Sequence, residues 1–192
     1  MEIVSTHRLQ WLGWLLVIGS LLVLAEALWI PTKAVVAQHL LRSAWALTRE
    51  TGIPQRPWPW ADHYPVGQLT VPRLDIDQII LAGDSGAVMA FAPGENMRTR
   101  EVEHAARVVT AHRDTHFRFL EHLRFDDLIE LRDQQGTAQY RVVSTNVVNS
   151  TTTQIDPTQV PDGLILVTCY PFDALTAGGE KRFVVVAEPI EP

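Results

Sequence analysis

Cys169, the one cysteine of the 192-residue chain, is the residue with the clearest potential for chemistry. It ends the apolar run Leu164 to Cys169 and is followed by Tyr170 and Pro171, so a buried strand is expected to emerge into a loop there. A thiol at such a place is either a buried and inert side chain or a nucleophile. A thiol nucleophile needs a base or a cation beside it, because only the thiolate attacks.

His112 is the strongest candidate partner among the seven histidines. It follows the β-branched run Arg107 to Ala111, a second predicted strand that ends in polar residues. Arg182 opens the strand that is expected to pair with the cysteine strand, where its guanidinium would hold an oxyanion or orient a peptide carbonyl. The alternative for Arg182 is a surface ion pair with Glu180 or Glu188.

Composition and spacing exclude other kinds of site. One cysteine and scattered histidines give neither a CxxC nor an HExxH pattern, so no metal site is predicted. The 16 Lys and Arg against 22 Asp and Glu give a net charge of −6, which argues against a nucleic-acid partner held by phosphate contacts. A content of 46% hydrophobic and 20% charged residues excludes a disordered chain.

The densest apolar run, Leu9 to Ile30, predicts a transmembrane helix. Its one charge is Glu26, and at about 1.5 Å per residue a helix over this run reaches roughly 30 Å, the thickness of the hydrocarbon core of a bilayer. Arg8 lies on the short flank, so we expect a single span in contact with lipid and the later residues outside the cytoplasm. The alternative is a cleaved signal peptide, because residues 25–27 read Ala-Glu-Ala.

Patterning divides the chain into three parts. Residues 1–32 are predicted to form a cytoplasmic stub and the membrane anchor. Residues 33–65 are predicted to form an amphipathic helix followed by a linker, whose four prolines forbid a helix. Residues 66–192 are predicted to form one domain.

The third part is a series of short β-branched runs separated by turn residues. Seven or eight such strands and few helical segments indicate a mainly antiparallel barrel or sandwich. Residues 133–136, Asp-Gln-Gln-Gly, predict a hairpin turn. The clearest runs are Gln68 to Val71, Ile79 to Leu81, Arg107 to Ala111, Leu128 to Arg132, Gln139 to Val148, Gly163 to Tyr170 and Arg182 to Glu188.

Three segments resemble motifs of the sortase family. Ile165 to Cys169 resembles its TLxTC motif, Ala111 to Phe117 resembles its histidine segment, and Arg182 to Val185 resembles its arginine strand. The likeness extends over about residues 66 to 190. Upstream, Trp29 to Trp45 and Pro57 to Pro72 resemble the single-sortase group of Gram-negative bacteria.

The resemblance implies a closed β-barrel of seven to eight strands with short helices and a cysteine transpeptidase activity without a metal or organic cofactor. Cys169 would attack a sorting motif near the C-terminus of an exported protein and form a thioacyl enzyme, which an amine would resolve. His112 would be the general acid and base, Arg182 would brace the oxyanion, and Thr168 is a secondary candidate for the oxyanion site. The domain would lie on the periplasmic side of the inner membrane.

Two other functions use the same features. A thiol protease would resolve the same thioester with water. A membrane-tethered binding domain would keep the barrel without catalysis.

Overall fold

The computed structural model describes residues 6–176 and 178–190. Residues 1–5, which belong to the predicted cytoplasmic stub, lie outside the described residues. The chain divides into two compact units, Met1–His39 and Leu40–Pro192. The division into anchor, linker and barrel at residues 32 and 65 stays a prediction.

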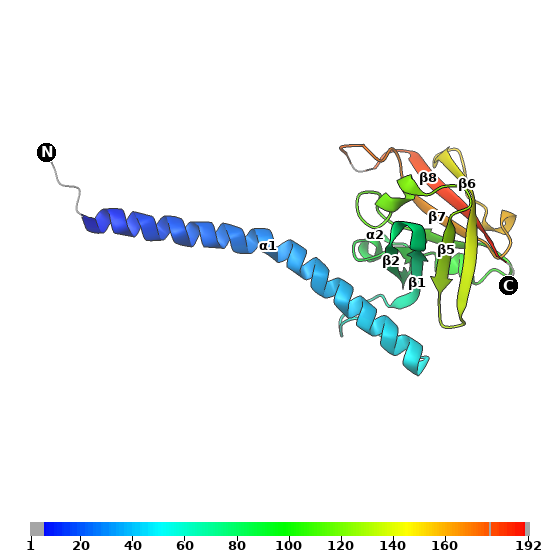
Figure 1. The fold of residues 1–192 in the computed structure, drawn as a ribbon, viewed down its shortest axis with the longest axis horizontal. Coiled ribbons are helices and arrows are strands. Elements are labelled where there is room, and N and C mark those ends of the chain that lie inside the picture. Colours follow the sequence, from blue (N-terminus) through cyan, green and yellow to red (C-terminus); the bar gives the residue numbers. More distant parts are fainter. Residues whose placement is uncertain (1–5, 177, 191–192) are drawn as a thin grey trace. The chain divides into compact units, whose positions relative to one another are not determined.

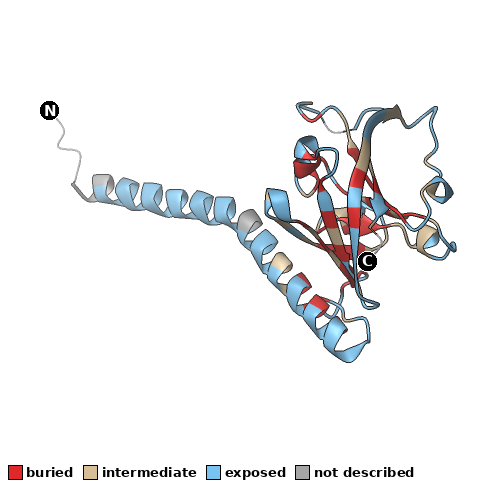
Figure 2. Ribbon diagram, turned by 45° about the vertical axis from the view of Figure 1, so that its right-hand side comes forward, coloured by how far each residue is buried: buried red, intermediate tan, exposed pale blue. Residues whose placement is uncertain are grey.

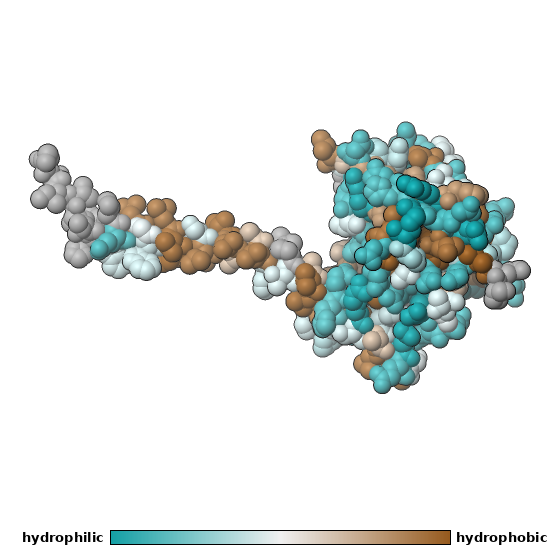
Figure 3. All heavy atoms as spheres, in the orientation of Figure 1, coloured by the Kyte–Doolittle hydropathy of each residue, from teal (hydrophilic) through white to brown (hydrophobic). Residues whose placement is uncertain are grey.

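The first unit is formed by the larger part of α1 (Thr6–Thr51). Its apolar side chains are exposed on all sides of the helix rather than along one stripe, as Trp14, Leu21 and Val23 illustrate. Figure 3 shows this apolar surface along α1. The described helix is long and apolar enough to cross a membrane, which matches the predicted transmembrane helix by length and composition.

The last turns of α1 belong to the second unit and pack against the barrel. Leu41, Trp45 and Thr48 are buried and follow one another at spacings of four and three residues, so they lie on one face of the helix. Leu41 and Trp45 form a hydrophobic cluster with residues of β2 (Ile76–Ala82). One face of this end of α1 is therefore covered by the barrel, while the division of residues 33–65 into an amphipathic helix and a linker stays a prediction.

The strands of the second unit close into a barrel (Figure 1). Around it the order is β1-β2-β3-β4-β7-β8-β6-β5, which confirms the predicted closed barrel of seven to eight strands with short helices. The remaining strands are β1 (Pro65–Val71), β3 (Gly94–Glu95), β4 (Arg107–Thr110), β5 (Leu128–Arg132), β6 (Thr137–Asn149), β7 (Leu164–Cys169) and β8 (Lys181–Pro189). The short helices are α2 (Gly86–Met89), α3 (Met97–Arg100), η1 (Pro72–Leu74), η2 (Arg118–His122) and η3 (Pro157–Gln159).

Parallel pairing between β4 and β7 is the feature of the barrel that matters most for the site. Most neighbouring strands are antiparallel, as predicted, but β2–β3 and β4–β7 are parallel. Strand β7 is buried on both faces: Leu164 and Leu166 belong to the central core, and Ile165 and Val167 to a second cluster. A strand that is covered on both sides reads as a continuous apolar run, which this one does. Figure 2 shows the buried residues along the barrel strands.

The predicted turn between β5 and β6 is confirmed. The backbone N–H of Asp133 donates to the carbonyl of Gly136 at 2.8 Å. The side chain of Asp133 accepts from the backbone N–H groups of Gln135 and Gly136 at 2.8 and 3.1 Å. An aspartate that binds its own turn in this way stabilises the hairpin locally.

Candidate active site

Cys169 and Arg182 are opposite each other in the barrel wall. Cys169 is the last residue of β7, and the antiparallel register with β8 pairs it with Arg182. This confirms the predicted pairing of the arginine strand with the cysteine strand. Both residues are half-buried, and Cys169 is a free thiol.

His112 follows the strand that runs beside β7. Because β4 and β7 are parallel and Thr110 is the register partner of Val167, both strands end at the same edge of the barrel. The backbone N–H of Ala111 donates to the carbonyl of Val167 at 3.3 Å, which extends the pairing by one residue. His112 comes next and is exposed, so an exposed imidazole follows directly on the segment that is paired to the cysteine strand.

Thr168 links β7 to the segment that follows β4 through a buried hydrogen bond. Its side chain is buried, and its hydroxyl donates to the carbonyl of Ala111 at 2.8 Å. The hydroxyl is thus used to attach the residue before Cys169 to the residue before His112.

Arg182 is bonded to its own loop. Its Nη1 donates to the carbonyls of Gly179 and Lys181 at 2.7 and 2.9 Å. Within the described residues it forms no ion pair with Glu180 or Glu188, so the surface ion pair is not observed. Gly179 has a φ of 92°, a left-handed conformation that favours glycine. The loop can therefore turn its carbonyl toward the guanidinium.

Arg113, which the sequence does not single out, has the densest set of contacts at this edge. Its side chain is only 3% exposed. Its Nε and Nη2 donate to the carboxylate of Asp114 at 2.7 and 2.9 Å. Its Nη1 donates to the carbonyl of Pro171 at 2.7 Å, and its Nη2 to those of Ala174 and Thr176 at 3.1 and 3.5 Å.

A second arginine and three aromatic rings hold the same loop. Arg118 donates through Nη1 to the carbonyl of Phe172. The rings of Phe172 and Phe183 meet edge to face with centroids 5.1 Å apart, and Tyr170 stacks on Phe183. The residues immediately after Cys169 are therefore anchored to the histidine segment and to β8.

The charged and titratable side chains at this edge influence one another. The hydrogen bond from Arg113 lowers the pKa of Asp114. The hydrogen bond to Asp114 is the largest cause of the raised pKa of Arg113, and the charge of Cys169 adds to it. Burial lowers the pKa of His116, and the nearby His112 lowers it further. Arg113 stays a cation, and His116 is favoured in its neutral form.

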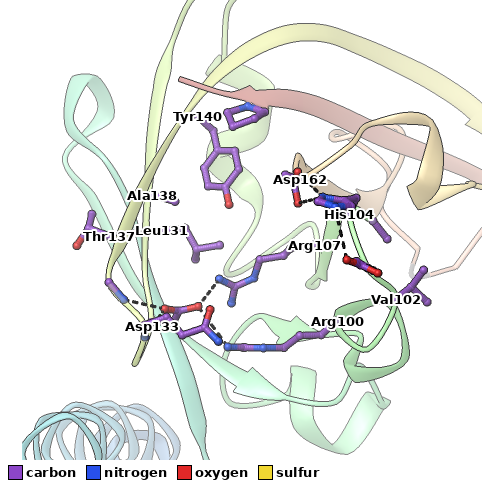
Figure 4. A pocket seen from close by; sticks show the side chains of 15 residues that line it. Arg100, Val102, His104, Arg107, Leu131, Asp133, Thr137, Ala138, Tyr140 and Asp162 are labelled. Carbon is purple, nitrogen blue, oxygen red and sulfur yellow. Dashed lines mark hydrogen bonds and ion pairs between the residues drawn. The ribbon is translucent and has the colours of Figure 1, made fainter. Parts of the chain in front are cut away.

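A pocket of about 560 Å³ lies at the other end of the barrel (Figure 4). Its wall includes Arg107, the first residue of β4, whereas His112 follows the last residue of that strand. Arg107 binds the buried carboxylate of Glu95 through two nitrogens, at 2.7 and 2.9 Å, and Arg100 binds it at 3.1 Å. Both arginines also bind Asp133. Every charge in this network is paired, so the network joins β3, β4 and the turn after β5.

The described residues contain no group of three or more His, Cys, Asp or Glu side chains that could hold a metal ion. The nearest arrangement is at the rim of the pocket, where Nδ1 of His104 lies 2.9 Å from Asp162 and Nε2 lies 3.7 Å from Glu103. The hydrogen bond with Asp162 raises the pKa of His104, so this arrangement is an exposed ion pair.

Comparisons with known proteins agree with this geometry. A family model described as the Sortase domain matches residues 69–190. Sortase D of Bacillus subtilis (strain 168) is 27% identical over 126 residues, which are 65% of this chain and 63% of that protein. The chain thus spans less than two thirds of the length of this relative.

Solved structures show the same fold. Sortase A from Corynebacterium diphtheriae has a TM-score of 0.58 at 24% identity, over 69% of this chain and 64% of that one. A complex of Streptococcus agalactiae sortase C1 with MTSET has a TM-score of 0.57 at 22% identity, over 67% of this chain and 68% of the other. At these identities the likeness establishes the fold.

Proposed function

The chain belongs to the sortase family, and on that basis we propose that it is a membrane-anchored cysteine transpeptidase that cleaves a C-terminal sorting motif of an exported protein. Cys169 is the proposed nucleophile, His112 the general acid and base, and Arg182 the donor to the oxyanion. The reaction uses no metal or organic cofactor.

In the first half of the proposed reaction the thiolate of Cys169 attacks the carbonyl carbon of the scissile peptide. A carbon–sulfur bond forms, and the carbonyl electron pair moves to oxygen, where the guanidinium of Arg182 donates a hydrogen bond. When the carbonyl re-forms, the carbon–nitrogen bond breaks and His112 gives its proton to the leaving amine. The product is a thioacyl enzyme.

In the second half an incoming amine attacks the thioester and gives a proton to His112. The carbon–sulfur bond breaks, a new amide forms, and Cys169 leaves as a thiolate. Thr168 has a supporting part in this scheme. Its side-chain hydroxyl holds Ala111 in place, so any contribution to the oxyanion site would come from its backbone.

One observation carries the proposal: the family's cysteine, histidine and arginine motifs meet at one edge of the barrel. Cys169 is the register partner of Arg182, and the residue before His112 is hydrogen-bonded to β7. A Cys, a His and an Arg from three adjacent segments are the groups that acyl transfer through a thioester requires.

We further propose that residues 9–30 cross the inner membrane once, in contact with lipid, and that the barrel lies on the periplasmic side. The long apolar helix supports the anchor. The partners are then an exported protein with a C-terminal sorting motif and an amine acceptor, and no nucleic acid. The resemblance to the single-sortase group of Gram-negative bacteria stays a prediction.

The decisive experiment incubates the full chain, in detergent, with a library of internally quenched peptides, with and without a short peptide that has a free amino terminus. A transpeptidase joins the acyl fragment to the added amine. A thiol protease releases the free acid in both cases. Absence of cleavage in both arms contradicts the enzyme proposal and leaves the tethered binding domain.

A further inference from the structure

One buried side chain binds several carbonyls of the segment that follows the nucleophile, residues 170–176. Arg113 donates to three of its carbonyls, those of Pro171, Ala174 and Thr176. The neighbouring carbonyl of Phe172 is bound by Arg118. Because this segment begins directly after Cys169, the contacts of Arg113 hold the backbone beside the proposed nucleophile.

The geometry of Arg113 requires a guanidinium. Its five hydrogen bonds leave from Nε, Nη1 and Nη2 and point both to the Asp114 carboxylate and into the loop. A lysine ammonium offers three donors from a single nitrogen and cannot reproduce this planar fork. The side chain is 3% exposed, so water does not replace a contact that is lost.

We propose that Arg113 is a positioning residue of the reaction, which fixes the segment after Cys169 against the histidine segment. This inference rests on the proposed function, in which Cys169 is the nucleophile.

The test measures amide hydrogen exchange of residues 170–176 and peptide cleavage in the full chain. Arg113→Lys keeps the charge but loses the planar fork, so exchange of these residues should become at least about tenfold faster, and kcat should fall by about tenfold with KM little changed. The control Arg141→Gln removes an exposed arginine whose distance to Asp126 is 3.5 Å, and it should change neither quantity.

Unchanged exchange of residues 170–176 in a folded Arg113→Lys protein overturns the proposal, and so does faster exchange with an unchanged kcat. Peptide cleavage by Cys169→Ala tests the proposed function separately, since hydrogen exchange needs neither a substrate nor a thiol.

Discussion

Cys169 and Arg182 present their side chains on the same face of the barrel wall, because they are direct partners in the antiparallel β7–β8 ladder. Their Cβ atoms are then about 5 Å apart. Thr168, one residue earlier, points to the opposite face, where its hydroxyl binds Ala111. Because side chains alternate along β7, Cys169 lies on the face with Arg182, whereas Thr168 lies on the other face and binds the neighbouring segment.

This pairing makes Arg182 the most informative position beside the nucleophile. Arg182→Lys keeps the charge but loses the planar fork, so it should reduce kcat/KM nearly as much as Arg182→Ala, by roughly 100- to 1000-fold. Turnover and Tm are measured for both variants. The exposed neighbour Lys181 is the control, and Lys181→Ala should change neither quantity. Unchanged turnover in Arg182→Ala with intact folding would remove Arg182 from the mechanism.

Membrane topology gives a second prediction. If residues 9–30 cross the membrane with the barrel outside the cytoplasm, protease added to spheroplasts should digest the barrel and spare a cytoplasmic control protein. Digestion only after lysis would contradict this topology.

Edman sequencing of the purified protein tests the alternative of a cleaved signal peptide, because a mature amino terminus at Leu28 would show that the Ala-Glu-Ala triplet is cleaved.

Gly94 provides a test of how the histidine strand is seated. It pairs with Thr110 of β4, and a Cβ at this position would lie 2.1 Å from the carbonyl oxygen of Gly83. Gly94→Ala must therefore displace backbone, and we expect a loss of about 2 to 3 kcal/mol in the free energy of unfolding, measured by urea denaturation. Gly86→Ala is the matched control, since no atom lies within 4 Å of its Cβ, and equal stability losses would contradict the steric account.

Asp127 predicts how stability depends on pH. It accepts hydrogen bonds from Nε and Nη2 of Arg73, both at 2.5 Å, and these bonds lower its pKa. A carboxyl whose pKa is lower in the folded state stabilises the fold above its unfolded pKa, about 4, and loses that contribution as the pH falls through the folded value. Asp127→Asn should cost about 2 kcal/mol at pH 7 and progressively less in acid.

Urea denaturation at a series of pH values measures this effect. The neighbouring Asp126 is the control, because it is exposed and lies 3.5 Å from Arg141. Asp126→Asn should cost under about 0.5 kcal/mol at every pH. A constant difference between Asp127→Asn and the unmodified chain from pH 7 to pH 3 would contradict the interpretation.

Local patterns were sufficient to predict most of the barrel. The run Leu128 to Arg132 coincides with β5, and the turn at residues 133–136 joins it to β6 as predicted. Strand β3 was missed because its two residues, Gly94 and Glu95, show no apolar alternation. Glu95 is fully buried, against the usual preference of a carboxylate, since Arg107 and Arg100 bind it inside the barrel.

The sequence predicts only those site residues that lie next to a recognisable strand. Cys169, His112 and Arg182 each adjoin a recognisable strand, so the sequence marks them. Arg113 reads as an ordinary turn residue, because its carbonyl partners lie 58 to 63 positions later in the chain. The parallel pairing of β4 with β7, which no local pattern encodes, brings these partners to it.

The most direct test of the account is the intact mass of the full chain, quenched in acid during turnover of a peptide selected from the library. We expect the intact mass to increase by the mass of the acyl fragment, and digestion should locate this increase on a peptide that contains Cys169. Hydroxylamine should remove the adduct. Cys169→Ala should show neither adduct nor cleavage, with a Tm close to that of the unmodified chain. Cleavage by Cys169→Ala at the unmodified rate, or an acyl group on another residue, would contradict it.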